Sequence, residues 1–392
     1  MGLLPGAYTP LVQEAVTRLG SRITYREAQE ELEWFWGIDI SIGTVREITI
    51  RHGQIANELV TEEATRLEKE GPAATIHPEN LIMSTDGAFI HLTNGEWREV
   101  KTVAFGEFES RWKKKQSKLE TKTSNITYFS RLEGAEQFGH SALCEWQQRG
   151  GENAKQVVAV NDGAHWIQNF IDYHAPKAIR IIDFAHAQSY LATIGKAIYP
   201  PESDEFKRWF RQTSRQLKTQ PPHRLLADLY HLQTQFPDHP QAIEIEQAIR
   251  YLDSRQKMID YAHFTRLNLP IGSGMVESGH KVVVQRRMKQ AGMRWAEQNV
   301  NPMLALRMAL CNHRWSSTWN AIYARTRQTK RQARLQRAHL LDTSPPAQIV
   351  SEVDCQRLTK LANSVASNSK SRRPWKNNRW IFPHRPHLLH KN

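Results

Sequence analysis

The fold is decided by two neighbouring runs, NLIMSTDGAFIHL at residues 80–92 and WREVKTVAFGEF at residues 97–108. Both have the β-branched and aromatic content of strands, and Asn94-Gly95 between them is a strong hairpin turn. A domain therefore begins near Pro78 with an antiparallel pair of strands. The basic, Ser/Thr-rich residues 109–130 follow, and we expect a third strand near Ile126–Phe129.

Downstream of this hairpin, helices alternate with short apolar strands. Residues 134–150 and 163–174 read as helices, and residues 156–160 and 178–182 read as β runs. Such alternation implies parallel pairing. The order of elements is that of a ribonuclease H-like fold, which brings the ends of its first and fourth strands side by side at the sheet centre. Asp86 and Asp162, each at a strand end in an Asp-Gly pair, would meet there.

A third acid lies in Ile271-Gly-Ser-Gly-Met-Val-Glu-Ser-Gly-His-Lys281, where Glu277 stands among cations at a helix start. Carboxylates are the hard oxygen ligands that hold two divalent ions about 4 Å apart for phosphodiester chemistry. A lone strand-end Asp-Gly is more often a simple turn, and Glu277 could merely pair with Lys281. Asp86 and Asp162 in this order, followed by Glu277, favour a metal site.

Other side chains near these acids are candidates for the same site. Asp183 and His186 could ligate a metal, with Asp183 as the alternative middle acid, or form a structural contact beneath it. Trp166 and Trp295 could stack on an unpaired base, although a core role is the commoner one. The cations expected to contact DNA phosphates are Lys281, Arg286, Arg287, Lys289 and Arg294.

The amino-terminal residues 1–60 form a predicted helical region. Thr24-Tyr-Arg-Glu27 has the capping-box pattern before a helix that Gly37 ends, and Ser41 can cap a second helix. That second helix would present Thr44, Arg46, Arg51 and His52 on its outer face. The pair has the length of a helix-turn-helix that binds DNA, and an ordinary helical hairpin remains the alternative.

The remaining segments complete the predicted organisation. Residues 61–77 read as a helix and linker, 78–186 as the first part of the core, 187–268 as an all-helical insertion, 269–320 as the core's completion with the glutamate helix, and 321–392 as a basic, partly disordered tail. From residue 298 onward, 17 Lys and Arg stand against three acids, a net charge of +14 within a chain total of +13. This asymmetry indicates a polyanion-binding end.

Composition excludes several classes of protein. No apolar run approaches the ~18 residues that a membrane span needs, and no secretory leader is recognisable, so cytoplasmic residence is expected, with nucleoid association on DNA. Cys144, Cys311 and Cys355 support neither a disulfide framework nor a zinc site. The absence of a phosphate-binding or dinucleotide glycine loop argues against a nucleotide cofactor.

Three blocks of the chain closely resemble the transposases of ISKra-type insertion sequences. They begin at DGAFIHLTNGEW, VNDGAHWIQNF and IGSGMVESGHK, and the likeness spans residues 8–320. This resemblance implies a DDE transposase with a ribonuclease H-like domain, two Mg²⁺ ions, and the triad Asp86, Asp162 and Glu277. Mn²⁺ suits the same oxygen ligands.

The expected function is therefore metal-dependent strand cleavage and strand transfer at the ends of an insertion sequence. The expected partners are double-stranded DNA, both element ends and target, and further copies of this chain. One alternative is an inactive or repurposed transposase-derived DNA-binding protein. The other is a ribonuclease H-like nuclease that hydrolyses DNA or RNA without joining strands.

Overall fold

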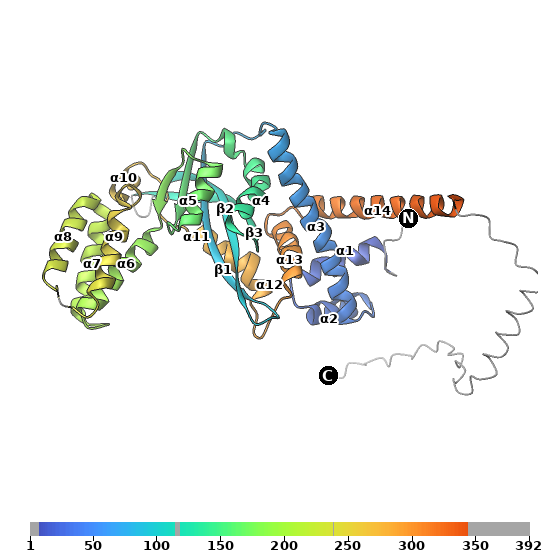
Figure 1. Cartoon of the computed structure of the whole chain (residues 1–392), viewed down its shortest axis with the longest axis horizontal. Coiled ribbons are helices and arrows are strands. Elements are labelled where there is room, and N and C mark those ends of the chain that lie inside the picture. The colour runs from blue at the N-terminus through green and yellow to red at the C-terminus, as the bar shows by residue number, and fades with distance from the viewer. Residues whose placement is uncertain (1–7, 114–117, 238, 344–392) are drawn as a thin grey trace, which may run out of the picture. The chain divides into compact units, whose positions relative to one another are not determined.

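The computed structural model describes residues 8–113, 118–237 and 239–343. It confirms the mixed α/β class, with helices packed around a sheet (Figure 1). The sheet is mixed and five-stranded, in the order β3-β2-β1-β4-β5. The strands are β1 (Asn80–His91), β2 (Trp97–Lys113), β3 (Lys118–Arg131), β4 (Gln156–Asn161) and β5 (Ile179–Ile182).

The predicted hairpin is confirmed. β1 and β2 pair antiparallel over the whole length of β1, and Gly95 in the turn between them has a φ of 90°. Glycine adopts this left-handed conformation without a steric penalty. The strand expected near Ile126–Phe129 is the end of a longer β3, which pairs antiparallel with β2.

The parallel half of the sheet is also as predicted. β4 pairs in parallel with both β1 and β5. The connecting helices are α4 (Ala135–Gln148), preceding a 3-10 turn η2 (Gly151–Asn153), and α5 (His165–His174). Val158, Ala159 and Val160 of β4 are 0% exposed, as expected for a strand covered on both faces.

Helices cover both faces of the sheet. Tyr128 and Phe129 are neighbours on β3 and so point to opposite faces. The Phe129 ring packs on Phe138 of α4, with ring centroids 5.9 Å apart. On the other face, the ring of Tyr128 lies against Gly279, at the end of α11 (Gly274–Gly279).

The amino-terminal helices begin and end where the sequence indicates. They are α1 (Pro10–Gly20), α2 (Tyr25–Trp36) and α3 (Ile42–Glu70). Thr24 and Glu27 form the reciprocal capping box at the start of α2, Gly37 ends that helix at φ 63°, and Ser41 caps α3. Each cap satisfies backbone groups that a helix end leaves unpaired.

Two details of this region differ from expectation. α3 runs without a break across residue 60, so residues 61–70 belong to the same helix as residues 42–60. His52 does not lie on an outer face: it is 1% exposed, and its Nδ1 lies 2.7 Å from the Thr17 hydroxyl oxygen. Burial lowers the pKa of His52 to about 3, so its ring is neutral and belongs to the core.

Two buried arginines join these helices to the segment that follows Glu277. Arg287 Nε donates to the carbonyl of Gly20 at 2.9 Å, and Arg307 Nη1 donates to that of Ser21 at 3.1 Å. Both side chains are at most 4% exposed. Their hydrogen bonds satisfy carbonyls at the turn between α1 and α2, which fixes that turn on the core.

Residues 184–266 form the helical insertion, and within its described residues no strand occurs. Its elements are α6 (Phe184–Ile198), α7 (Asp204–Thr219), α8 (Pro222–Thr234), α9 (Ala242–Asp253), η3 (Gln256–Met258) and α10 (Tyr261–Arg266). The chain then forms α11, the π-helix η4 (His280–Gln285), α12 (Arg286–Met288), η5 (Glu297–Asn299), α13 (Val300–Cys311) and α14 (Trp315–Thr343). One compact unit extends to Thr329, and a second begins at Lys330.

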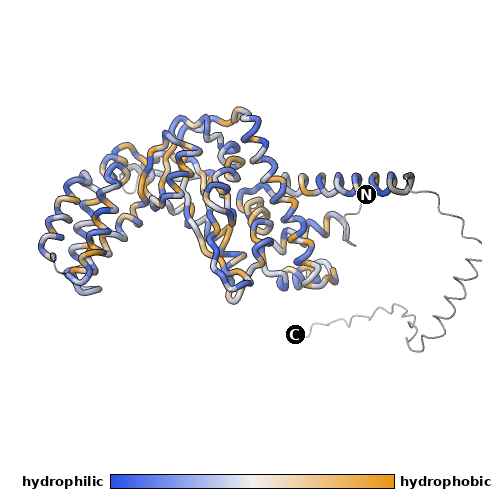
Figure 2. Tube along the Cα trace, in the orientation of Figure 1, coloured by the Kyte–Doolittle hydropathy of each residue, from blue (hydrophilic) through white to orange (hydrophobic). Residues whose placement is uncertain are grey.

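Hydrophobic residues run along the strands of the sheet, whereas α14 is mostly hydrophilic (Figure 2). Among the described residues, no helix combines the length and the apolar character that crossing a membrane requires.

α3 packs so closely on α13 that Gly53 of α3 has no space for a side chain. An added Cβ at Gly53 would lie 2.6 Å from the carbonyl oxygen of Pro302, a backbone atom that cannot rotate away. Gly53→Ala is therefore expected to lower the free energy of unfolding by about 1–3 kcal/mol, measured by urea denaturation. Gly43→Ala in the same helix is the control: its nearest neighbour would be Ser41 Oγ at 3.7 Å, so stability should hold or rise. Equal losses in both variants would contradict this packing argument.

Candidate functional site

Asp86 lies within β1, and Asp162 follows the end of β4 directly. The prediction that Asp86 ends its strand is wrong, because β1 runs on to His91 and continues to pair with β2. The parallel pairing of β1 with β4 ends at Met83 and Ala159. Each aspartate follows the last residue of that pairing by three positions, so the two stand at the same level of the sheet. The structure therefore brings together the two carboxylates that the sequence singled out.

Asn161, the last residue of β4, ties the middle of β1 to the residue that follows β5. Its Oδ1 accepts a hydrogen bond from the backbone N–H of Thr85 in β1 at 2.5 Å, and its carbonyl accepts one from the N–H of Asp183, just after β5, at 2.7 Å. Asn161 is 2% exposed. Sequence reasoning missed this residue, although a buried amide directly before Asp162 is the signal that could have identified it.

The carboxyl group of Asp86 is held in an unfavourable electrostatic environment. Burial raises its pKa above the ordinary value, and the negative charges of Asp162 and Glu99 raise it further. A hydrogen bond from the Gly87 backbone N–H and the nearby His280 act in the opposite direction without cancelling the rise. Like charges crowded around a half-buried carboxyl group are characteristic of functional sites.

The helix that carries Glu277 crosses the sheet beside Asp86. At Gly279 there is no space for a side chain, because an added Cβ would lie 2.7 Å from the ring of Tyr128. This close approach explains the glycine two residues after Glu277. The glutamate itself is exposed, and its charge reaches His280, whose pKa it raises.

His280 is a residue of the site that sequence reasoning missed. Its Nδ1 lies 3.6 Å from Asp86 Oδ2, and its side chain is 8% exposed. Burial lowers the pKa of His280, with Asp86 and then Glu277 opposing the change. It stands three residues after Glu277, a spacing that shares one helix face. The helix continues there as the π-helix η4, a form often found at functional sites.

Asp183 acts as a clamp between β5 and the loop that precedes α11. Its Oδ1 accepts from the His186 backbone N–H at 2.8 Å, and its Oδ2 accepts from Ser273 N–H at 2.7 Å and Ser273 Oγ at 2.9 Å. The His186 ring instead faces Tyr190 and Tyr251 edge-on. These contacts favour the structural alternative for Asp183 and His186 over metal ligation.

The helical insertion holds the turn that contains Asp162. Tyr251 of α9 donates its hydroxyl hydrogen bond to the carbonyl of Asp162, and Arg255 Nη2 donates to that of Gly163 at 3.4 Å. Gly163 has a φ of 81°, and an added Cβ would meet Ile182 and Tyr251. Tyr251 lies about ninety residues from Asp162 in the chain, so only the folded structure brings the two together.

Most of the predicted DNA-contacting cations are accessible. Those with exposed side chains are Lys281, Arg286, Lys289, Arg294 and Arg46, while Arg51 is half-buried and pairs with Glu47. Arg287 is a correction: it is 1% exposed and donates to the carbonyl of Gly20. Its position on the inner face of α12 makes it a core residue rather than one of the exposed surface cations.

The two tryptophans proposed for base stacking have different surroundings. Trp295 is 5% exposed, its Nε1 donates to the carbonyl of Met288 at 3.1 Å, and the Arg287 guanidinium lies 5.0 Å from its ring centroid. This burial corrects the stacking hypothesis for Trp295. Trp166 is half-buried, with the Lys101 ammonium 5.3 Å from its ring centroid.

Across the described ranges, no three His, Cys, Asp or Glu side chains converge closely enough to hold a metal ion. The acids brought side by side are Asp86 and Asp162. Glu277 stands on the neighbouring helix, and its charge interaction within the site is with His280.

One family model matches residues 7–319, that of an uncharacterised protein family, UPF0236. The chain belongs to this family. The matched range holds every residue of the UPF0236 site described above, together with α1–α3 and the helical insertion. No curated protein matches the chain.

The clamp at Asp183 can be tested by stability. Asp183→Asn keeps one acceptor oxygen but places an amide N–H₂ against another donor, and it removes charge-assisted bonds to Ser273. We expect a loss of about 2 kcal/mol in the free energy of unfolding, measured by urea denaturation. Asp260→Asn is the control, because Asp260 caps α10 through one bond to His263 N–H and Asn is an equally good cap. Similar losses in both variants would argue against a clamp.

Because the pKa of Asp86 is raised in the folded protein, we expect the effect of this residue on stability to depend on pH. Because its pKa in the folded protein lies above the ordinary 3.8, ionisation of Asp86 costs the folded state free energy at neutral pH. Asp86→Asn should therefore raise the melting temperature at pH 7. The gain should disappear as the pH falls below about 3.8, where the wild-type carboxyl is protonated in both states.

The control for this measurement is Asp39→Asn, an exposed aspartate before α3. It should leave the melting temperature unchanged across the same pH range. A melting temperature of Asp86→Asn that is lower than wild type at pH 7 would show that the Asp86 charge stabilises the fold instead.

Proposed function

We propose that this UPF0236 member is a DNA transposase that cuts and joins strands at insertion-sequence ends. The observation that carries the proposal is the position of Asp86 and Asp162, each three residues beyond the last pair of the parallel strands β1 and β4, beside the helix of Glu277. A β3-β2-β1-β4-β5 order with these acids supports a ribonuclease H-like core. The resemblance to ISKra-type transposases supports the same reading.

Two of the three expected carboxylates, those of Asp86 and Asp162, lie together and are suitable ligands for a divalent cation. Asp86 and Asp162 are hard oxygen donors. Burial, and to a lesser degree the charge of Asp162, raises the pKa of Asp86, and a bound cation would offset both effects. Asp86 and Asp162, with Glu277 as third acid, would hold Mg²⁺ or Mn²⁺. Bound there, such ions would supply Lewis-acid stabilisation of the charge that develops on a phosphodiester.

The chain's own residues orient and support these acids. His280 stays neutral beside Asp86 because burial lowers its pKa, so it offers the carboxylate a polar neighbour without a fixed charge. Tyr251 and Arg255 hold the backbone of the Asp162 turn. Exposed cations that follow Glu277, such as Lys281 and Arg286, are suited to contact the DNA backbone.

End recognition is assigned to the amino-terminal helices. α2 and α3, joined through Gly37 and Ser41, are of the size of a helix-turn-helix, and Arg46 is exposed near the start of α3. We propose that α3 enters the major groove. Transposition requires two element ends in one complex, so several copies of this chain are expected to assemble on double-stranded DNA in the cytoplasm.

One observation favours a second candidate, a DNA-binding protein without catalysis. No third acid converges with Asp86 and Asp162 within the part of the chain that the structure describes. If Glu277 does not close onto the pair when DNA binds, the helical region and the basic carboxyl-terminal residues would act by binding alone.

The test is strand cleavage and strand transfer on labelled duplexes that carry the flanking ends of this chain's own element, with Mg²⁺. Wild type should yield joined products, and chelation of the metal should abolish them. Glu277→Gln should lower the rate by about 10³-fold, equivalent to about 4 kcal/mol of transition-state stabilisation. Glu297→Gln is the matched control, since that exposed glutamate only pairs with Arg98 and should retain full activity.

Each other outcome selects a different reading. If wild type binds the element ends but never cleaves them, the protein is a DNA-binding protein without catalysis. If it cleaves strands but never joins them, it is a nuclease without strand transfer. Full activity of Glu277→Gln would remove that residue from the site.

A further inference from the structure

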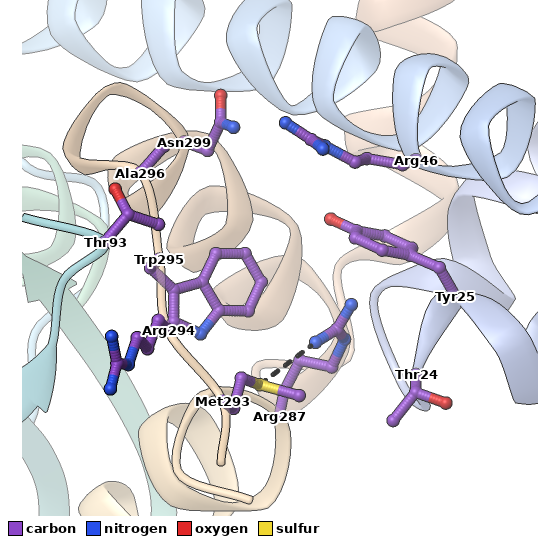
Figure 3. A pocket seen from close by; sticks show the side chains of 10 residues that line it. All are labelled: Thr24, Tyr25, Arg46, Thr93, Arg287, Met293, Arg294, Trp295, Ala296 and Asn299. Atoms are coloured by element: carbon purple, nitrogen blue, oxygen red, sulfur yellow. Dashed lines mark hydrogen bonds between the residues drawn. The ribbon is translucent and has the colours of Figure 1, made fainter.

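A cationic pocket lies between the amino-terminal helices and the loop after α12. Its volume is about 280 Å³, and Figure 3 shows the side chains that line it. Those that enter the argument are Tyr25 of α2, Arg46 of α3, Thr93 of the β1–β2 turn, Arg287 of α12, and Trp295 and Asn299 of the following segment. Elements distant in sequence thus build one cavity.

The lining offers hydrogen-bond donors and positive charge. Arg46, Arg287 and Arg294 all line the pocket, and no carboxylate does. Arg46 extends toward Asn299 across the cavity, whereas Arg294 points away from Tyr25 (Figure 3). Burial raises the pKa of Tyr25, and the positive charges of Arg287 and Arg46 lower it. Both guanidinium groups therefore contribute positive potential at the Tyr25 side chain in the pocket.

Arg287 carries unused donor capacity into this pocket. Its guanidinium lies 4.6 Å from the ring centroid of Tyr25 and 5.0 Å from that of Trp295. The Nε donates to Gly20, Nη1 donates to the Met293 sulfur at 3.7 Å, and the Tyr25 side chain interacts with the guanidinium. Nη2 is buried and makes no hydrogen bond of good geometry to any described residue. The nearby Glu27 is engaged in the capping box with Thr24. A buried guanidinium N–H without an acceptor is costly and marks a place for an anion.

We propose that this pocket binds one phosphate group, and that its source is the backbone of DNA lying along α3. Guanidinium groups match the paired oxygens of phosphate, and hydroxyl and amide donors from Thr93 and Asn299 suit the remaining oxygens. A base is excluded from the indole face, because Arg287 covers Trp295. The DNA source rests on the proposed function, whereas the phosphate site rests on the pocket alone.

The pocket would couple recognition to catalysis. Arg46 belongs to the helix assigned to end recognition, and Arg287 lies ten residues after Glu277 on the chain. One phosphate bonded by both would connect the position of α3 on DNA with the helix that carries the third acid.

The test uses the full chain without Mg²⁺, so that binding is read apart from cleavage. Fluorescence anisotropy measures the affinity for duplexes in which single phosphates are replaced, one position at a time, by uncharged methylphosphonates. In wild type one position should weaken binding about tenfold. In Arg46→Ala, a methylphosphonate at that position should no longer weaken binding, because the substitution and the uncharged phosphate analogue each remove the same contact. Arg26→Ala, an exposed arginine on α2, should keep the wild-type profile.

A second arm uses inorganic phosphate as the probe at constant ionic strength. It should raise the melting temperature of wild type and Arg26→Ala more than that of Arg46→Ala. A phosphate response with a flat methylphosphonate profile would overturn the DNA source and leave a small phosphate compound as the ligand. No difference between the variants in either arm would overturn the site. A pocket confirmed here in a chain that never cleaves DNA would refute the proposed catalysis alone.

Discussion

Parallel pairing of β1 with β4 is the constraint on which the candidate site depends. It sets Asp86 level with Asp162, and burial raises the pKa of Asp86, with a smaller contribution from the charge of Asp162. The fold tolerates these two neighbouring carboxylates because the adjoining part of β4 is tightly packed: Val158, Ala159 and Val160 are fully buried. Stability lost at the charged edge is offset in the apolar interior, a distribution typical of functional sites.

Three contacts of long sequence separation keep this edge in place. Asn161, at the end of β4, bonds Thr85 within β1 through its side chain and Asp183 after β5 through its carbonyl. Asp183 ties β5 to the loop before Glu277, and Tyr251 ties the insertion to Asp162. The insertion is therefore part of the support of the site. Because its helix α9 bonds the turn itself, movement of the insertion would displace the backbone of Asp162.

Much of the fold could be predicted from local pattern, since strands, caps and turns depend on residues close in sequence. The Asn94-Gly95 hairpin, the Thr24 capping box and the strand end before Asp162-Gly163 are of this kind, whereas Asp86-Gly87 lies within β1 because pairing with β2 carries that strand on to His91. Burial of Arg287, Trp295 and His52 could not, because an arginine two positions from Lys289 shows no local sign of which helix face meets Gly20. Tyr251 was missed for the same reason: its partner lies in another element.

Arginine serves two opposite purposes within a few residues of Glu277. Arg286 is exposed and suited to a phosphate, while Arg287 next to it is buried and pins Gly20. Burial lowers the pKa of Arg287 and of Arg307, so the fold tolerates these charges at a cost that their carbonyl bonds partly offset. A hydrophobic residue could fill either space. A cation at Arg287 has a role beyond packing if its Nη2 group meets an anion in the pocket between α2, α3 and the loop after α12, as proposed above.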